Sequence, residues 1–370
     1  MSKDIDILQQ EAIALLQQLI ATPSFSKEED KTAAIIFNYL QQNGVSVQRI
    51  NNNIFAVNKY FDAAKPVVLL NSHHDTVKPN PQYTKDPFEP LVEDGKLFGL
   101  GSNDAGGCLV SLIAAFCYFY EQESLAYNIV LAATAEEEIS GTGGVELLLQ
   151  HPDFLAATAQ TKENAYHNWT AIVGEPTLLQ MAVAERGLMV LDCISHGKAG
   201  HAARGEGENA IYKALKDITW FNQFTFDKVS DLLGPSRMNV TVIETENKQH
   251  NVVPAVCKFV VDTRINELYS FEEALSIIKA NVDCEIKPRS TRLRSTSISL
   301  DHALVQAGMQ MNKTYYGSPT TSDKALMNFQ ALKMGPGDSA RSHTADEFIY
   351  IEEINQGVQD YITILQKICK

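Results

Sequence analysis

Apolar residues recur at helical spacing at the start of the chain and later gather in short continuous runs. The spacing over Ile5–Leu19 predicts a helix that ends before Pro23, and Ser26-Lys-Glu-Glu29 is typical of a capping box that opens a second helix at Lys31–Gln42. The short apolar runs predict strands at Asn53–Val57, Val67–Asn71, Asn128–Ala133 and Ala171–Val173, with helices around Leu109–Tyr120 and Val145–Leu149. Strands that alternate with helices indicate a doubly wound α/β sheet.

A different order of elements follows after about residue 180. Strands are expected at Gly187–Ser195, Arg237–Glu244, Val256–Arg264 and Glu285–Pro288, and helices at Asn209–Phe221 and Ser270–Ile278. This βαββαβ order is that of a ferredoxin-like α+β unit. We therefore predict a discontinuous α/β domain, 1–179 and 292–370, interrupted by an inserted domain at 180–291. An amphipathic helix from Ile351 is expected to end the chain.

Composition and charge exclude several classes of protein. With 31 Lys and Arg against 45 Asp and Glu, the 370-residue chain has a net charge of −14, which argues against a nucleic-acid binder. The longest apolar stretch, Cys108–Tyr120, is too short to cross a membrane, and the acidic start MSKDIDILQQ is unlike a signal peptide. Six cysteines without a CxxC pair are typical of reduced thiols, so we expect a cytoplasmic protein that does not bind membranes.

Five polar segments carry the candidate chemistry, and most of them directly follow a predicted strand. They are Ser72-His73-His74-Asp75, Gly101-Ser-Asn-Asp104, Glu136-Glu137-Glu138, Gly174-Glu175-Pro176 and Ser342-His343-Thr-Ala-Asp346-Glu347. Taken singly, each has an ordinary explanation as a polar turn, a helix cap or a solvated acidic loop. In doubly wound sheets, however, ligands bind beyond the carboxyl ends of the strands. Two histidines and three carboxylates there suit a pair of divalent cations, Zn²⁺ with Co²⁺ or Mn²⁺ as alternatives.

Other catalytic classes fit the sequence less well. A nucleotide fingerprint fails because Gly99 and Gly101 are followed by Asp104 where GxGxxG needs glycine. There is no GxSxG motif for a serine nucleophile. Cys108 and Cys117 lie in an apolar helical stretch, where thiols are usually inert.

The ordered segments SHHDTV, LGSNDAGG, AEEE, VGEPT and SHTADE resemble those of the M20 metallopeptidase family, and the similarity runs from Pro23 to the final helix. The resemblance implies a zinc-peptidase-like catalytic domain with an inserted dimerisation or lid domain. It also implies two zinc ions per subunit. His73 and Glu175 would bind the first ion, Glu138 and His343 the second, and Asp104 would bridge both.

The same resemblance assigns the catalytic roles. Asp75 would orient the His73 imidazole, and Glu137 would be the general base that takes a proton from the attacking water and returns it to the leaving amine. His201, in Gly197-Lys-Ala-Gly-His201, would stabilise the oxyanion in a neighbouring subunit, which implies a homodimer. Asn251 and Arg264 resemble residues that hold the substrate carboxylate.

The glycines of Gly335-Pro-Gly337 could offer backbone N–H groups to the same carboxylate. Three departures from the family pattern bear on the acyl group: Gly106 replaces a lysine, Ala202 and Ala203 replace hydroxyl residues, and Arg204 follows them.

Within the family, the GLGSNDAGG and GEPT segments are most similar to bacterial acetylornithine deacetylases. The expected function is therefore hydrolysis of an N-acyl amino acid, feeding arginine biosynthesis. The alternatives within the family are a deacylase that acts on N-succinyl amino acids, N-acetylcitrulline or an acylated diaminopimelate, and a dipeptidase. A catalytically silent metal- or ligand-binding relative is an alternative of a different class, although the general base candidate Glu137 argues against it.

Overall fold

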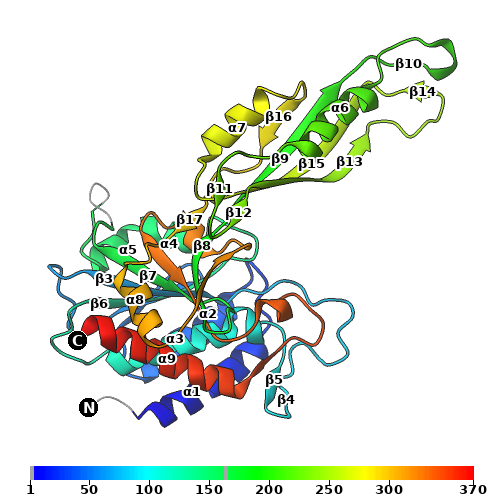
Figure 1. Cartoon of the computed structure of the whole chain (residues 1–370). Helices are drawn as coiled ribbons and strands as arrows, with labels where there is room; N and C mark the ends of the chain where they lie inside the picture. Colours follow the sequence, from blue (N-terminus) through cyan, green and yellow to red (C-terminus); the bar gives the residue numbers. More distant parts are fainter. Residues whose placement is uncertain (1–3, 162–165) are drawn as a thin grey trace. The chain divides into compact units, whose positions relative to one another are not determined.

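The computed structural model describes residues 4–161 and 166–370, and these form two compact units (Figure 1). The first unit comprises Met1–Val183, Ile298–Tyr316 and Ser322–Lys370. The second comprises Ala184–Ser297 and Gly317–Thr321. The insertion predicted at 180–291 begins and ends within a few residues of the long segment of the second unit.

A mixed sheet forms the centre of the first unit. Its strands are ordered β1 (Val47–Ile50), β2 (Asn53–Val57), β6 (Asn128–Thr134), β3 (Val67–His73), β7 (Trp169–Val173), β19 (Gln330–Lys333) and β8 (Met181–Glu185), and β18 (Tyr315–Ser318) also pairs with β8. Strand β8 ends in the second unit, where β17 (Thr296–Ser297) pairs with Ala184 and Glu185. The pairs β3–β6, β3–β7 and β7–β19 are parallel, and β1–β2 and β2–β6 are antiparallel. Every residue of β3, β6 and β7 is buried, as expected for central strands covered on both faces.

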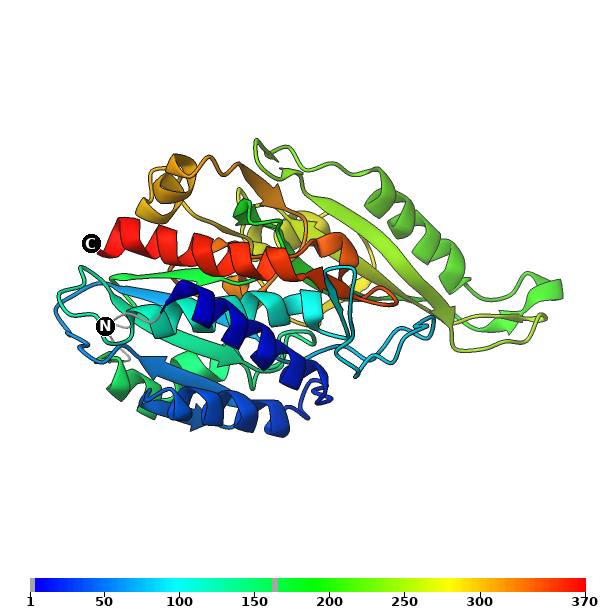
Figure 2. The same cartoon turned by 90° about the horizontal axis from the view of Figure 1, so that it is seen from below.

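Helices cover both faces of this sheet. On one face α1 (Ile5–Ile20), α3 (Gly107–Phe119) and α9 (Ile351–Cys369) lie side by side (Figure 2), next to α2 (Asp30–Gln42) and α8 (Ala303–Gln310). On the other face α4 (Val145–Gln150) and α5 (Pro152–Ala157) pack Leu148 and Phe154 against Leu69 and Val130. A small sheet, β20 (Phe348–Tyr350), β5 (Lys96–Phe98) and β4 (Val92–Glu93), lies beside α9.

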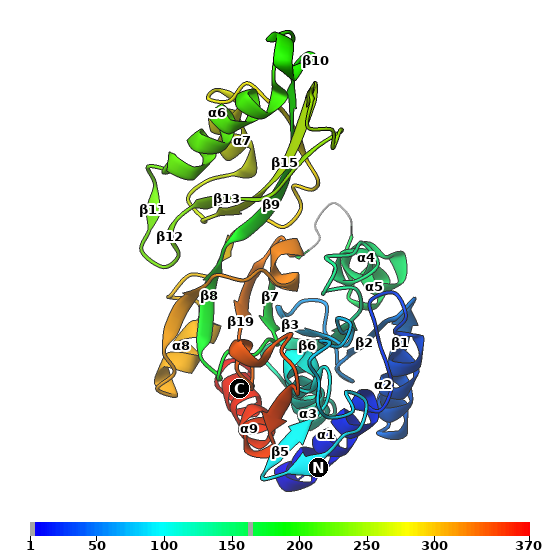
Figure 3. The same cartoon turned by 90° about the vertical axis from the view of Figure 1, so that its right-hand side faces the viewer.

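The second unit is a four-stranded antiparallel sheet with two helices on one face (Figure 3). Its elements follow the chain as β9 (Gly187–His196), α6 (Ala210–Gln223), β13 (Arg237–Thr245), β15 (Val256–Ile265), α7 (Phe271–Lys279) and β16 (Glu285–Pro288). The spatial order β13-β15-β9-β16 is the ferredoxin-like arrangement. Two short ribbons join β10 (Gly200–His201) to β14 (Val252–Val253) and β11 (Val229–Ser230) to β12 (Gly234–Pro235). The α/β fold class is confirmed, and the dimerisation role of this unit stays a prediction.

The predicted capping box at Ser26 is wrong. Helix α2 begins at Asp30, and its N-cap residue Glu29 makes no side-chain capping bond. The Ser26 hydroxyl instead donates to the buried Asp75 carboxylate at 2.7 Å, and the Glu29 carboxylate accepts from Lys27 N–H. A buried carboxylate needs donors, so this tertiary contact replaces the local cap that the sequence pattern favoured.

One described segment, Ser102–Phe119, is long and apolar enough to cross a membrane by length and composition alone. In the structure 83% of it is buried against the rest of the first unit. A core helix passes the same test of length and hydropathy, so the segment is weak evidence for a membrane span.

Candidate metal centre

The candidate site lies where three neighbouring parallel strands end. His73 is the last residue of β3, Glu137 follows the end of β6 at Thr134, and Glu175 follows the end of β7 at Val173. Because β3 pairs in parallel with both β6 and β7, these polar residues meet at one edge of the sheet. The position of the site therefore follows from the strand pairing.

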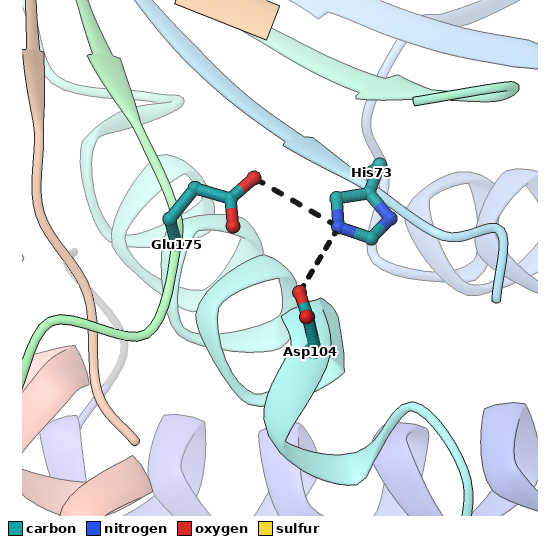
Figure 4. Close-up of side chains that lie close together, drawn as sticks. All are labelled: His73, Asp104 and Glu175. Atoms are coloured by element: carbon teal, nitrogen blue, oxygen red, sulfur yellow. Dashed lines mark ion pairs between the residues drawn. The ribbon is translucent and has the colours of Figure 1, made fainter. Parts of the chain in front are cut away.

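The first group of possible metal ligands is His73, Asp104 and Glu175 (Figure 4). The distance from His73 Nε2 to Asp104 Oδ1 is 3.5 Å, and that to Glu175 Oε1 is 3.8 Å. His73 Nε2 is buried and makes no hydrogen bond within the described part of the chain. A buried ring nitrogen that faces two carboxylates without a hydrogen bond suits a cation ligand.

The other ring nitrogen of His73 defines the tautomer of the neutral imidazole. Nδ1 lies 3.0 Å from the main-chain oxygen of Asp75, and a carbonyl oxygen only accepts hydrogen bonds. Nδ1 therefore carries the hydrogen, which leaves the lone pair on Nε2 pointing at the two carboxylates. The Asp75 carboxylate lies farther from Nδ1, at 3.4 Å. The carbonyl of Asp75 is thus the nearer partner of His73, a contact that the sequence resemblance could not specify.

The second group of possible ligands is Asp104, Glu138 and His343. His343 Nε2 lies 3.0 Å from Glu138 Oε2 and 3.6 Å from Asp104 Oδ2. Asp104 thus presents one carboxylate oxygen to His73 and the other to His343. Within each group the ligand atoms all lie within 4.8 Å of one another, and Asp104 is common to both groups. This arrangement suits two divalent cations that share one carboxylate.

The Asp75 carboxylate supports the acidic segment after β6. Its Oδ1 accepts the Glu137 N–H at 3.0 Å, and its Oδ2 accepts the Glu138 N–H at 3.2 Å together with the Ser26 hydroxyl. Burial acts to raise the pKa of Asp75, but the contact with His73, the charge on that imidazole and the Ser26 hydrogen bond together outweigh burial and lower this pKa. Asp75 is therefore held as an anion that fixes the main chain of both glutamates.

Negative charge dominates the site. Burial, reinforced by the neighbouring Glu175, raises the pKa of Glu137 well above its usual value, and Glu137 Oε2 lies 4.0 Å from His73 Nε2. The hydrogen bond to Glu138 raises the pKa of His343 to about 9. The pKa of Glu138 is raised as well, chiefly by burial, so two carboxyl groups beside the imidazoles favour their neutral form in the absence of a cation. This excess of negative charge also suits divalent cations.

The sequence interpretation missed a polar network beneath the site. The buried Asp323 Oδ2 accepts the Thr134 hydroxyl at 2.8 Å, and Asn71 Nδ2 donates to Thr134 Oγ1 at 2.9 Å. Burial raises the pKa of Asp323 to about 6. Asp323 begins a 3-10 turn, Asp323–Leu326, that carries none of the motifs, so nothing in its local sequence indicated this position.

The two glycines proposed for carboxylate binding, Gly335 and Gly337, are closely packed against residues near the candidate ligands. The Gly335 N–H donates to the Thr177 hydroxyl at 3.0 Å, so that donor is engaged within the fold. A Cβ at Gly335 would lie 2.6 Å from both Cys108 Sγ and the Glu175 carbonyl oxygen. Gly337 has a φ of 85° and packs against Asn103. Close packing accounts for both glycines, and their role toward a substrate stays a prediction.

Three further candidate residues belong to the second unit. His201 pairs with Val252 in the β10–β14 ribbon, is exposed, and accepts the Ala203 N–H. Asn251 precedes that ribbon and is also exposed. The Arg264 guanidinium donates two hydrogen bonds to Asp262, at 2.7 and 3.0 Å. The roles of these residues stay predictions.

A comparison with protein families identifies the type of enzyme. The model of peptidase family M20/M25/M40 matches residues 69–367, which include all five candidate ligands. The chain belongs to this family. It is therefore a hydrolase, as the sequence resemblance predicted, and the M20 assignment is confirmed.

Individual relatives agree with this assignment. Succinyl-diaminopimelate desuccinylase 2 of Ruegeria sp. is 26% identical over 93% of this chain and 91% of that protein. The M20 metallo-carboxypeptidase Sso-CP2 of Sulfolobus solfataricus shares the fold with a TM-score of 0.73 at 16% identity, over 97% of this chain and 99% of that one. The YXEP protein of Bacillus subtilis, described as a dinuclear metal-binding M20 peptidase, has a TM-score of 0.69 at 14% identity over 98% of each chain.

Proposed function

We propose that this hydrolase cleaves the amide bond of small N-acyl amino acids at a two-metal site. The observation that carries the proposal is the shared carboxylate of Asp104, whose two oxygens face His73 and His343 at 3.5 and 3.6 Å. The partly buried side chain of Glu137 lies beside the first imidazole.

The donor set suits zinc. His73, Asp104 and Glu175 would hold one ion, and Asp104, Glu138 and His343 the other, with two Zn²⁺ per subunit and Co²⁺ or Mn²⁺ as substitutes. Such cations, when bound, lower the pKa of a coordinated water and polarise a carbonyl oxygen. The buried Nε2 of His73, which makes no hydrogen bond to any residue that the structure describes, supports this assignment.

Glu137 is the proposed general base. Its raised pKa favours uptake of a proton from the attacking water, and the same carboxyl can return that proton to the leaving nitrogen. The two hydrogen bonds from Glu137 and Glu138 to Asp75 hold this side chain next to the ligands. The water oxygen bonds to the acyl carbon and the C–N bond breaks, so the products are a free carboxylate and the free amine.

Two substrates are the leading candidates. The sequence segments favour N-acetylornithine, and with it a role in arginine biosynthesis. Similarity to proteins named succinyl-diaminopimelate desuccinylase favours N-succinyl-diaminopimelate as the second candidate. Both are N-acyl amino acids with free carboxylates, which Arg264 and Asn251 of the second unit would help to bind.

A homodimer and a cytoplasmic location belong to the same proposal. The edge strand β13 exposes Val242 and Ile243, and α6, which packs beside it, exposes Tyr212 and Leu215. An exposed apolar edge of this kind supports pairing with a second copy, in which His201 would reach the neighbouring site. The six free cysteines support a reducing compartment.

The decisive experiment is a substrate panel. N-acetyl and N-succinyl derivatives of ornithine, citrulline and diaminopimelate are assayed with Zn²⁺ and with Co²⁺, before and after chelation. We expect metal-dependent release of the free amine from one acyl class. Bound metal without hydrolysis of any compound would instead favour a catalytically silent binding protein.

The contribution of His201 is tested by subunit mixing. His201→Ala should lower turnover without loss of metal, and mixing it with a Glu137→Ala variant should partly restore activity. No restoration despite confirmed subunit exchange would exclude action across a dimer.

A further inference from the structure

The side chain of Glu347 is buried next to the candidate metal centre without facing it as a ligand. It lies four residues after His343 and is 2% exposed. Its Oε1 accepts the N–H groups of Asn103 and Asp104, each at 2.9 Å, and its Oε2 accepts the Gly101 N–H at 3.1 Å. The main-chain oxygen of Glu347 also accepts the Gly99 N–H at 3.0 Å.

The segment that Glu347 contacts has an irregular backbone. Gly101 has a φ of 75°, and Asp104 has an extended conformation, with φ −118° and ψ 96°, before helix α3 begins at Gly107. Gly101 and Asn103 are buried, so water does not readily reach their N–H groups. Buried N–H groups need an acceptor, and here one carboxylate supplies it for three of them.

We propose that Glu347 is a positioning residue that sets the Asp104 carboxylate between the two ligand groups. The inference rests on the proposed two-metal function. Glu347 and His343 lie on one short segment of the chain. The Glu347 carboxylate therefore also connects the Asp104 turn to the segment that carries His343, a possible ligand of the second group. Asn103 adds a parallel link, since its side chain exchanges two hydrogen bonds of 3.0 Å with the main chain of Asp338.

The preceding residue, Asp346, offers a matched control. The Asp346 carboxylate also accepts main-chain N–H groups, from Thr84 at 2.8 Å and from Lys85 at 2.9 Å, together with the Thr84 hydroxyl. Like Glu347, Asp346 is a carboxylic acid that accepts hydrogen bonds from main-chain N–H groups, and it lies on the same segment. The loop that it supports, at Thr84 and Lys85, is a different one. Asp346→Asn removes a charge next to Glu347 without touching the Asp104 turn.

The test compares Glu347→Gln with Asp346→Asn in the full chain. Glutamine offers one acceptor oxygen and one donor nitrogen, so at least one of the three N–H groups loses its acceptor. We expect hydrogen exchange to accelerate at least about tenfold at one or more of Gly101, Asn103 and Asp104 in metal-free Glu347→Gln. Calorimetric titration with Zn²⁺ should show affinity about 10- to 100-fold weaker, as is typical when a residue that supports a metal ligand is changed.

Asp346→Asn should change the exchange rates and the Zn²⁺ affinity less than about threefold. Unchanged exchange and affinity in Glu347→Gln, or equal losses in both variants, would overturn the proposal. If Glu347→Gln does not fold, Glu347→Asp keeps the carboxyl group on a shorter side chain and should give intermediate values. Wild-type values in Glu347→Asp would count against the proposal. The absorption spectrum of bound Co²⁺ should also differ from wild type in the Glu347 variants, because a displaced Asp104 alters the ligand field.

The exchange measurement separates this inference from the proposed function. It needs no metal, so acceleration confined to the Glu347 variant supports the contact with the turn even if no substrate is hydrolysed. Failure of wild-type protein to bind metal would instead reject the two-metal function, and with it the purpose assigned to Glu347.

Discussion

The Asp75→Asn substitution tests the support that the Asp75 carboxylate gives to the acidic segment. In the wild-type protein the Asp75 oxygens accept the N–H groups of Glu137 and Glu138 and the Ser26 hydroxyl. Asparagine keeps one oxygen, which can retain Glu137. Its amide nitrogen then faces the Glu138 N–H, so two donors meet and that N–H loses its acceptor.

The expected loss follows from these contacts. A buried N–H without an acceptor costs about 1–3 kcal/mol, and a bond to a charged acceptor contributes up to about twice as much as a neutral one. Since the Ser26 hydroxyl can turn to accept from the new amide, we expect a loss of about 2–4 kcal/mol in the free energy of unfolding. That is a large part of the about 5–15 kcal/mol typical of a domain, but it leaves the chain folded.

Two assays measure this effect. Urea unfolding followed by circular dichroism gives the stability of Asp75→Asn, and calorimetric titration with Zn²⁺ gives its metal affinity. Because Glu138 shifts, we expect affinity to fall about 10- to 100-fold. Ser26→Ala is the control, since it removes one donor and leaves both N–H contacts intact, so metal affinity should stay within about threefold of wild type. Wild-type stability and affinity in Asp75→Asn would refute the reasoning.

Four further predictions concern the site and the surface. Glu137→Gln should keep its metal content, measured by elemental analysis, while turnover falls about 10²- to 10⁴-fold; unchanged turnover would remove Glu137 from the mechanism. Zn²⁺ affinity should rise as the pH approaches about 9, because the pKa of His343 is raised to that value and only the neutral imidazole binds metal. Calorimetry in two buffers should detect the release of protons on Zn²⁺ binding, and an affinity that does not change from pH 6.5 to 9 would contradict this prediction. Gly335→Ala should lower the free energy of unfolding by about 1–3 kcal/mol, measured by thermal unfolding, because the new Cβ would lie 2.6 Å from Cys108 Sγ. A wild-type melting temperature would show that the loop adapts to the added methyl group. Ile243→Lys should dissociate the proposed dimer in sedimentation experiments, and an unchanged mass would place the interface elsewhere.

Local patterns determined most of the elements. The strands at Asn53–Val57 and Glu285–Pro288 match the prediction residue for residue, and the final helix begins at Ile351 as expected. Hydrophobic periodicity and turn residues act over a few positions, which is why such elements can be read from sequence. The βαββαβ order of the second unit follows from the same patterns.

The sequence also determined which polar segments gather at the site, because strand ends in a parallel sheet share an edge. The separate roles of Glu137 and Glu138 came from the family resemblance, since adjacent carboxylates are equivalent in a pattern. The resemblance named Asp75 as well, but it did not show that its carboxylate holds the main chain of both glutamates.

Only the tertiary structure decided the partners of the supporting residues. Ser26 bonds to Asp75 across 49 positions, Thr134 to Asp323 across 189, and Asp104 N–H to Glu347 across 243. No periodicity links positions so far apart. Such contacts arise because a buried polar group must find whatever donor or acceptor the packed chain brings beside it, and that choice is made by the fold as a whole.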